Sequence, residues 1–150
     1  MSSSRKSTHV KRVQYAALPY RLNGDSRPEV MLVTSRDTRR WIIPKGWPQK
    51  GKAPHLSAAR EAFEEAGVTG AVSRRSVGTF SYAKRLKKGG VVECEVRVFA
   101  LQVKRQQRQW PEMNQREVMW LSANLAARTV REPMLGRIIR RLARSPRSRS

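Results

Sequence analysis

The chain has 150 residues, of which 32 are Lys or Arg and 11 are Asp or Glu, so its formal net charge is +21. This length predicts one domain, and a hydrophobic content of 39% is sufficient for one packed core. The excess of positive charge indicates an anionic partner such as a phosphorylated molecule, a nucleic acid or an acidic membrane surface.

Several classes of protein are inconsistent with this sequence. No stretch approaches the ~20 consecutive apolar residues that a membrane-spanning helix needs. Residues 1–9 contain basic residues without an apolar run behind them, so we expect no secretory signal. The single cysteine, Cys94, excludes an intrachain disulfide framework, and with only His9 and His55 a zinc site is not expected. We therefore expect a protein of the reducing cytoplasm.

Basic residues gather at both ends of the chain. Residues 1–9 and 144–150 contain no acidic residue and few apolar ones, so we expect flexible basic tails around a domain of residues 10–143. The domain is itself basic, because residues 13–136 still carry 22 basic and 11 acidic side chains. Two interpretations of the tails stay open: solvated segments, or segments that bind nucleic acid or anionic lipid.

The first half of the chain predicts strands, a loop and one helix. Apolar runs predict strands at residues 13–18, 30–34 and 41–43. Residues 44–51, rich in Gly and Pro, predict a loop. A helix is expected over 54–66, because Pro54 suits a first helical turn and Gly67 suits a left-handed C-terminal position. The apolar stripe expected to face the core consists of Leu56, Ala59, Phe63 and Ala66.

The second half predicts further strands and a closing helix. Strands are expected at residues 77–83, 91–103 and 118–121, with a basic hairpin connection over 84–90. Residues 132–143 predict an amphipathic helix with arginines on its polar side. Its apolar side is expected to consist of Leu135, Ile138, Ile139 and Leu142. This order of elements predicts an α+β fold, an α/β/α sandwich with a mixed sheet.

Three of the few acidic residues lie within five positions of the expected helix. Glu61, Glu64 and Glu65 are related as i, i+3 and i+4, so they share one helical face. Their mutual repulsion is destabilising unless a cation lies among them. Carboxylate oxygens without nearby His or Cys favour Mg²⁺, Mn²⁺ or Ca²⁺ over zinc. The alternative is a solvated face on which Arg60 pairs with Glu64.

Residues 46–68 resemble the Nudix box, whose pattern is G-x5-E-x7-R-E-U-x-E-E-x-G-U, where U is a bulky apolar residue. The matching positions are Gly46, Arg60, Glu61, Glu64, Glu65, Gly67 and Val68. Residues 41–46 are similar to the strand that leads into the box. The stretch Trp120–Leu121 before a terminal helix is also similar, so the resemblance covers roughly residues 10–143.

The resemblance implies a Nudix fold and a hydrolase that uses Mg²⁺ or Mn²⁺. It implies that Glu61, Glu64 and Glu65 bind the metal and act in catalysis, with Arg60 orienting a carboxylate and Gly46 making a backbone contact. Two positions depart from the pattern: Lys52 stands where the first Glu belongs, and Ala62 replaces a larger apolar residue. Lys52 leaves the number of metal ions open, because it removes one ligand or contacts phosphate directly.

The basic loop at 44–48 resembles the branch of the family that acts on diphosphoinositol polyphosphates and diadenosine polyphosphates. The implied reaction is attack by water on a phosphorus of a diphosphate linkage in such a small polyphosphorylated substrate. The residues expected to bind its phosphates are Lys45, Gly46, Lys52, Lys84 and Arg85. The cluster at 84–88 has an alternative interpretation as an ordinary charged hairpin tip.

Several alternatives remain open at this point. A runner-up function is removal of pyrophosphate from RNA 5′ ends, with RNA bound by the basic surface and tails. A third possible function is that of a catalytically weak Nudix-fold module that binds nucleic acid or has a regulatory role. The sequence does not identify the general base, for which Glu64, Glu65 or an acid from another loop, such as Glu112 or Glu117, could serve. Trp47, Tyr82 and Trp110 have two alternative roles: they stack on a nucleotide base of the substrate, or they only pack against other side chains of the protein. Both a monomer and a homodimer are compatible with the sequence.

Overall fold

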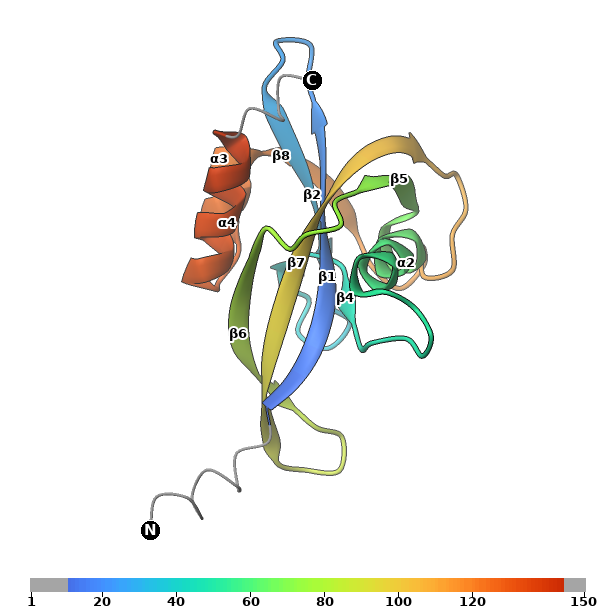
Figure 1. The fold of residues 1–150 in the computed structure, drawn as a ribbon, viewed down its shortest axis with the longest axis vertical. Helices are drawn as coiled ribbons and strands as arrows, with labels where there is room; N and C mark the ends of the chain where they lie inside the picture. Colours follow the sequence, from blue (N-terminus) through green and yellow to red (C-terminus); the bar gives the residue numbers. More distant parts are fainter. Residues whose placement is uncertain (1–10, 145–150) are drawn as a thin grey trace.

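In residues 11–144, which the computed structural model describes, a mixed sheet of eight strands forms the middle layer and helices cover both faces (Figure 1). The predictions made for residues 1–9 and 145–150 lie outside the described residues. In chain order the elements are β1 (Lys11–Leu22), β2 (Pro28–Thr34), β3 (Trp41–Ile42), β4 (Lys45–Gly46), α2 (Pro54–Ala66), β5 (Val68–Val72), β6 (Gly78–Arg85), β7 (Val91–Gln106), β8 (Val118–Ser122), α3 (Ala123–Thr129) and α4 (Pro133–Ala143).

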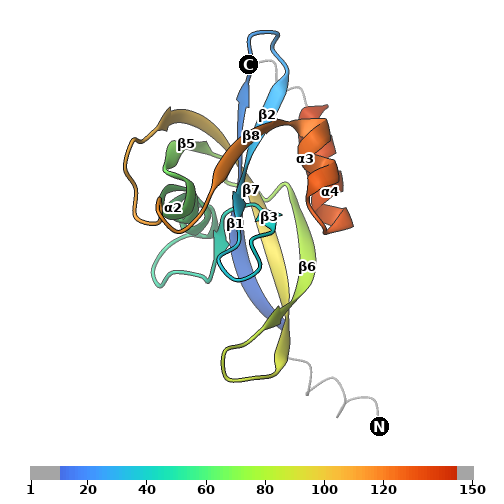
Figure 2. The same cartoon turned by 180° about the vertical axis from the view of Figure 1, so that it is seen from behind.

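Strand β1 lies at the centre of the sheet and gives it its mixed character. It pairs in parallel with β7 and antiparallel with β2 and β4. The sheet continues from β2 to β3 and β8, and from β7 to β5 and β6. Helix α2 covers one face, and α3 and α4 cover the other, as the opposite views in Figures 1 and 2 show. The predicted α+β sandwich is confirmed.

Alternate residues of the central strands face two separate cores. In β1, Ala16 and Leu18 pack in the core beneath α3 and α4, whereas Ala17 packs in the core beneath α2. In β2, Leu32 belongs to the first core and Met31 to the second. A strand that is covered on both faces is apolar along nearly its whole length. The continuous apolar runs therefore predicted these strands correctly.

Three elements were missed: β4, β5 and α3. Strand β4 has only two residues, and β5 lies at the sheet edge with Val68 as its buried side chain. The pairing of β5 with β7 shifts in register between Thr69 and Gly70, and glycine is needed at position 70 because a Cβ there would collide with the carbonyl oxygen of Gln102 on β7. Helix α3 has seven residues, and the Ser122 side chain accepts a hydrogen bond from the Leu125 N–H. That serine cap was the available sequence signal.

Helix α2 spans the predicted residues and ends at Gly67 with φ of 72° as expected, but the predicted buried face is wrong. Of the four residues in the predicted stripe only Ala66 is buried, and Leu56 is 46% exposed. The buried apolar positions are Ala58, Ala62 and Ala66. Small side chains fit here because α2 packs closely against β1. The shift matters for function, since Glu65 is buried on this face.

Helix α4 confirms the other predicted apolar face. Its buried side chains include Leu135, Ile138, Ile139 and Leu142. They pack on the sheet together with Phe80 of β6 and Val98 of β7. No helix within residues 11–144 is long and apolar enough to cross a membrane.

Candidate active site

A cleft of about 800 Å³ lies between α2, the loops around β3 and β4, and the hairpin that joins β6 to β7. The acidic side chains that line it are Asp37, Glu61, Glu65 and Glu112. The basic ones are Arg12, Arg36, Lys45, Lys84, Arg85, Lys87 and Arg116. Of the site residues expected from the sequence, the cleft brings together Lys45, Gly46, Glu61, Glu65, Lys84 and Arg85. Arg60, Lys52 and Glu64 are not among its lining residues.

Helix α2 delivers two carboxyl groups to this cleft from positions one turn apart. Glu65 is only 3% exposed, and Glu61 is half-buried beside it. Strand β4 pairs with β1, with Gly46 opposite Tyr15, and this pairing lays Gly46 against Glu61. A Cβ on Gly46 would collide with the Glu61 carboxyl group. Glycine therefore provides the room in which Glu61 reaches the cleft.

The two carboxyl groups are poorly compensated. Burial raises the pKa of Glu65 to about 9, an effect that Arg116 opposes and the neighbouring Glu61 reinforces. Burial also raises the pKa of Glu61, and the charge of Glu64 adds to it. Within residues 11–144, Oε1 of Glu65 has no hydrogen-bond partner. A cation placed between the two groups would satisfy that oxygen and stabilise both charges.

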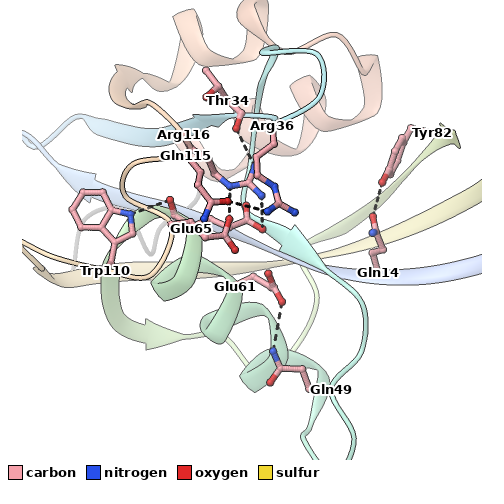
Figure 3. A network of polar contacts seen from close by, with 11 residues as sticks. Gln14, Thr34, Arg36, Gln49, Glu61, Glu65, Tyr82, Trp110, Gln115 and Arg116 are labelled. Atoms are coloured by element: carbon pink, nitrogen blue, oxygen red, sulfur yellow. Dashed lines mark hydrogen bonds and ion pairs between the residues drawn. The ribbon is translucent and has the colours of Figure 1, made fainter. Parts of the chain in front are cut away.

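Arg116 ties Glu65 to the rest of the cleft. Its side chain is 8% exposed, with Nη2 3.6 Å from Glu65 Oε2 and Nε donating to Glu112 Oε1 at 2.8 Å. Nη1 donates to the carbonyl oxygen of Thr34 at 3.0 Å, so the guanidinium joins three separate segments (Figure 3). Arg116 was not predicted from the sequence, because one loop arginine among 32 basic residues carries no local pattern.

The segment that carries Glu112 and Arg116 is anchored on the C-terminal end of α2. The Trp110 indole N–H donates to the carbonyl oxygen of Glu65 at 3.2 Å, and the Glu112 N–H donates to that of Glu64 at 3.0 Å. These donors satisfy carbonyl groups that the end of a helix leaves free. The anchoring explains how residues almost 50 positions beyond α2 come to line the same cleft.

Two of the general-base candidates, Glu112 and Glu117, lie outside the Nudix-box segment 46–68, and the structure places them differently. Glu112 lines the cleft. Glu117 does not; it forms an ion pair with Arg39 at 3.1 Å, and its side chain is 67% exposed. Of these two residues, Glu112 is therefore the one placed where it could accept a proton from a water molecule in the cleft.

Arg60 and Glu64 form the exposed pair that the sequence analysis named as the alternative for this helix face. Arg60 Nε lies 2.7 Å from Glu64 Oε2, and both side chains are partly exposed. Arg60 thus contacts a carboxylate outside the cleft. A role for Glu64 as a metal ligand would require this ion pair to open.

A second cavity of about 610 Å³ adjoins the first. The two share Lys45 and the hairpin residues 84–87. The second cavity extends to the start of α4, where Glu132 and Leu135 line it, and along β6, where Phe80 and Tyr82 line it. We call the first cavity the α2 compartment and the second the α4 compartment.

Lys45 lies at the junction of the compartments. Its Nζ is 4.8 Å from the centroid of the Tyr82 ring. Burial lowers the pKa of Lys45, while the charges of Glu65 and Glu132 act in the opposite direction. The ammonium group thus faces one carboxyl group from each compartment and is positioned to contact a phosphate that spans them.

The remaining candidates differ in placement. Lys52 is exposed in the loop before α2, and its backbone N–H donates to the Gln49 carbonyl oxygen. Trp47 is 40% exposed and lines the α2 compartment. The Tyr82 hydroxyl donates to Gln14 Oε1 at 2.7 Å. The ring of Trp110 occupies the space beside Gly67, so Trp110 packs rather than lining either compartment.

These side chains could supply only some of the ligands that a metal ion needs. In the part of the chain that the structure describes, no three His, Cys, Asp or Glu side chains converge closely enough to hold one. Glu61 and Glu65 nevertheless fit a hard divalent cation, because both are oxygen ligands and one buried oxygen lacks a partner. The remaining ligands would come from water, substrate or backbone, as Mg²⁺ commonly accepts.

A sequence profile described as the NUDIX domain matches residues 12–142. The chain belongs to the NUDIX domain family. The resemblance that residues 46–68 suggested is thereby confirmed, and proteins of this family generally use divalent metal ions.

Individual relatives agree with this assignment. "Nudix hydrolase 12, mitochondrial" from Arabidopsis thaliana is 30% identical over 122 residues, which cover 77% of this chain and 59% of that protein. "Diphosphoinositol polyphosphate phosphohydrolase 3-beta" from Bos taurus is 49% identical over 47 residues, 31% of this chain and 29% of that protein. The chain thus spans about six-tenths of the length of the first relative. Since one relative is named as mitochondrial, the cytoplasmic location stays a prediction.

Solved structures support the fold. The crystal structure of an Ap4A hydrolase from C. elegans matches with a TM-score of 0.63 over 90% of this chain and 98% of that one. Its sequence is 16% identical, so this likeness concerns the NUDIX fold alone.

Proposed function

We propose that this NUDIX protein is a divalent-metal-dependent hydrolase that cleaves a phosphoanhydride bond of a polyphosphorylated small molecule. The observation that carries the proposal is the pair of buried, poorly compensated carboxyl groups, Glu61 and Glu65, in a cleft lined by seven Arg and Lys side chains. The basic side chains that line the cleft attract an anionic substrate, and a bound cation would stabilise the charges of the two carboxyl groups. A polyphosphate with a bound metal ion meets both requirements.

Glu61 and Glu65 would hold Mg²⁺ or Mn²⁺, which when bound neutralises charge on phosphate oxygens. Lys45, Lys84 and Arg85 would bind the remaining phosphate oxygens. Glu112 is our candidate for the group that orients a water molecule and accepts its proton. The oxygen of that water forms a bond to phosphorus as the anhydride P–O bond breaks, and the leaving phosphate carries away the electron pair.

The α4 compartment favours a nucleotide-type substrate. Phe80, Tyr82 and Leu135 line it, and since Phe80 and Leu135 are buried in the core, the Tyr82 ring is the apolar surface that a purine ring would contact, whereas an inositol ring carries only polar substituents. Oε1 of Glu132 has no hydrogen-bond partner in the described part of the chain but is buried, so an exocyclic amino group would reach it only after the Glu132 side chain turns toward the cavity. We therefore propose a diadenosine polyphosphate as the substrate, ahead of a diphosphoinositol polyphosphate.

A substrate panel tests the proposal. Hydrolysis by the full chain should be measured with Mg²⁺ or Mn²⁺ on diadenosine tetraphosphate, a diphosphoinositol polyphosphate and 5′-triphosphorylated RNA. We expect kcat/KM to be at least about tenfold higher for diadenosine tetraphosphate than for the other two. A preference for the inositol compound would contradict the role of the α4 compartment, and a preference for RNA would favour the runner-up function.

The Gly46→Ala variant tests the placement of Glu61. The added methyl group collides with the Glu61 carboxyl group, so the carboxylate must move and kcat/KM should fall at least about tenfold. Gly24→Ala is the control, because no atom lies within 4 Å of a Cβ at that position. Steady-state kinetics of both variants, with melting curves to confirm folding, give the comparison. Equal kcat/KM in both would show that the position of Glu61 does not matter.

A further inference from the structure

The face of the molecule opposite α2 carries a concentration of arginines that the proposed function does not use. Seven exposed arginines lie on α3, on α4, directly after α4 and on the loop of residues 73–77: Arg74, Arg75, Arg128, Arg137, Arg140, Arg141 and Arg144. We call this set the arginine face. Helices α3 and α4 lie on one side of the sheet and α2 on the other (Figures 1 and 2).

The arginine face is not neutralised by acidic residues of this chain. None of its seven members forms an ion pair with another described residue. The sequence from 66 to 92 contains no acidic residue, and from 118 to 144 it contains only Glu132. Glu132 is already bound to Arg40 at 3.4 Å. The positive charge therefore stays available to an external anion.

A shallow groove concentrates this charge. The groove has a volume of about 350 Å³ and runs between the 73–77 loop and α4, with Arg75 on one wall and Arg141 on the other. Arg141 Nη1 donates to the carbonyl oxygen of Val77 at 3.3 Å, which holds the guanidinium against the loop. Two guanidinium groups on one groove suit a phosphate group, which arginine binds through paired N–H donors.

The loop that carries Arg75 is firmly attached to the sheet. The Ser73 hydroxyl accepts from the Ala100 N–H at 3.1 Å, and the Ser76 hydroxyl donates to the Val98 carbonyl oxygen at 3.0 Å. Both partners lie on β7, the longest strand. Since the loop is already ordered, binding an anion there costs little additional conformational entropy.

Helix α4 extends the charge along a row. Its arginines at 137, 140 and 141, and Arg144 directly after its last residue, stand at spacings of three and four residues, which puts the Cβ atoms of neighbouring side chains about 5–6 Å apart on one face. A row of this kind matches a ligand with repeated phosphates better than one with a single phosphate. The apolar side of α4 is buried in the core apart from Met134, which is 42% exposed, so the helix has little apolar surface left to insert into a membrane.

We infer that the arginine face binds the phosphodiester backbone of a nucleic-acid strand, independently of base sequence and of the catalytic cleft. The contacts are guanidinium to phosphate, and no base-reading group is required. A strand bound here would lie across the sheet from the α2 compartment. The inference does not depend on the proposed hydrolase activity.

The test compares two triple variants of the full chain that lose the same charge. One is Arg137→Gln, Arg140→Gln and Arg141→Gln on the arginine face. The control is Lys104→Gln, Arg105→Gln and Arg108→Gln, which removes three exposed basic residues from outside that face. Fluorescence anisotropy with a labelled 20-nucleotide oligouridylate, repeated at several salt concentrations, measures affinity and its salt dependence. Melting curves verify that both variants fold.

We expect the arginine-face variant to bind oligouridylate at least about tenfold more weakly than the control variant at 0.1 M salt. Its plot of log K against log salt should be shallower by about 2, since each phosphate contact on a single strand contributes about 0.7. Hydrolysis of diadenosine tetraphosphate should be equal in the two variants. Equal affinity for oligouridylate in both variants would overturn the inference. So would binding of the wild type to phosphatidylglycerol vesicles without binding to oligouridylate or oligothymidylate.

Discussion

Replacing Glu65 by glutamine should reduce kcat at least about 100-fold on diadenosine tetraphosphate, because the change removes one of the two carboxylates proposed to hold the metal. Mn²⁺ affinity, measured by electron paramagnetic resonance without substrate, should fall in parallel. Glu117→Gln is the control: that residue carries the same type of side chain but lies outside the cleft, and both quantities should stay near wild type. A Glu65→Gln enzyme with wild-type turnover and Mn²⁺ affinity would sink the assignment.

The same variant should be at least as stable as the wild type in the presence of a chelator. Burial raises the pKa of Glu65 from 4.5 to about 9, so the folded protein holds a proton that the unfolded chain releases above about pH 4.5. The contribution of this group to stability is therefore present at low pH and is lost as the pH rises toward 9. Arg116 keeps its bonds to Glu112 and Thr34 in the variant.

Melting curves at pH 6 and pH 9 measure this effect as a difference between the two proteins. From pH 6 to pH 9 the melting temperature of the wild type should fall by at least about 3 °C more than that of Glu65→Gln. This difference corresponds to roughly 1 kcal/mol in the free energy of unfolding for a domain of this size. Titrating groups that Glu65 does not influence are common to both proteins and cancel in the comparison, whereas the neighbouring Glu61 and Lys45, whose pKa values depend on Glu65, contribute to the difference. Parallel changes in melting temperature would mean that Glu65 does not carry a raised pKa.

Replacing Arg116 by methionine should lower the free energy of unfolding by about 3–5 kcal/mol. The guanidinium is almost fully buried, and its removal leaves the Glu112 carboxylate without its cation and the Thr34 carbonyl oxygen without its donor, whereas Glu65 stays protonated. Urea denaturation measures the loss.

Arg39→Met provides the comparison for Arg116→Met. Arg39 pairs with Glu117 at the surface, where both side chains are more than half exposed, so its loss should cost no more than about 1 kcal/mol. A similar small effect for both variants would show that Arg116 adds no net stability to the cleft.

The sequence predicted those parts of the molecule whose pattern is local. The central strands carry continuous apolar runs, and α2 is bounded by Pro54 and Gly67, so these elements were placed correctly. The box residues Glu61 and Glu65 could be assigned to one cleft because their spacing along a helix is fixed.

Contacts between distant segments were not predictable in the same way. Arg116 lies far along the chain from Glu65, and only the anchoring of the intervening loop on α2 brings them together. The prediction of the buried face of α2 was wrong because the helix lies so close to the sheet that alanines fit between them and the larger apolar side chains do not. Glu64 shared the expected face with Glu61, yet its carboxylate turns to Arg60 instead of the cleft.

The central claim is that the cleft at Glu61 and Glu65 catalyses metal-dependent attack of water on a phosphoanhydride. Hydrolysis of diadenosine tetraphosphate in ¹⁸O-labelled water, with Mg²⁺ or with a chelator, tests it directly. We expect mass spectrometry to find one ¹⁸O atom per turnover, bonded to phosphorus in one nucleotide product, and no turnover with the chelator. Turnover that is unaffected by the chelator, or ¹⁸O absent from the products, would contradict the account.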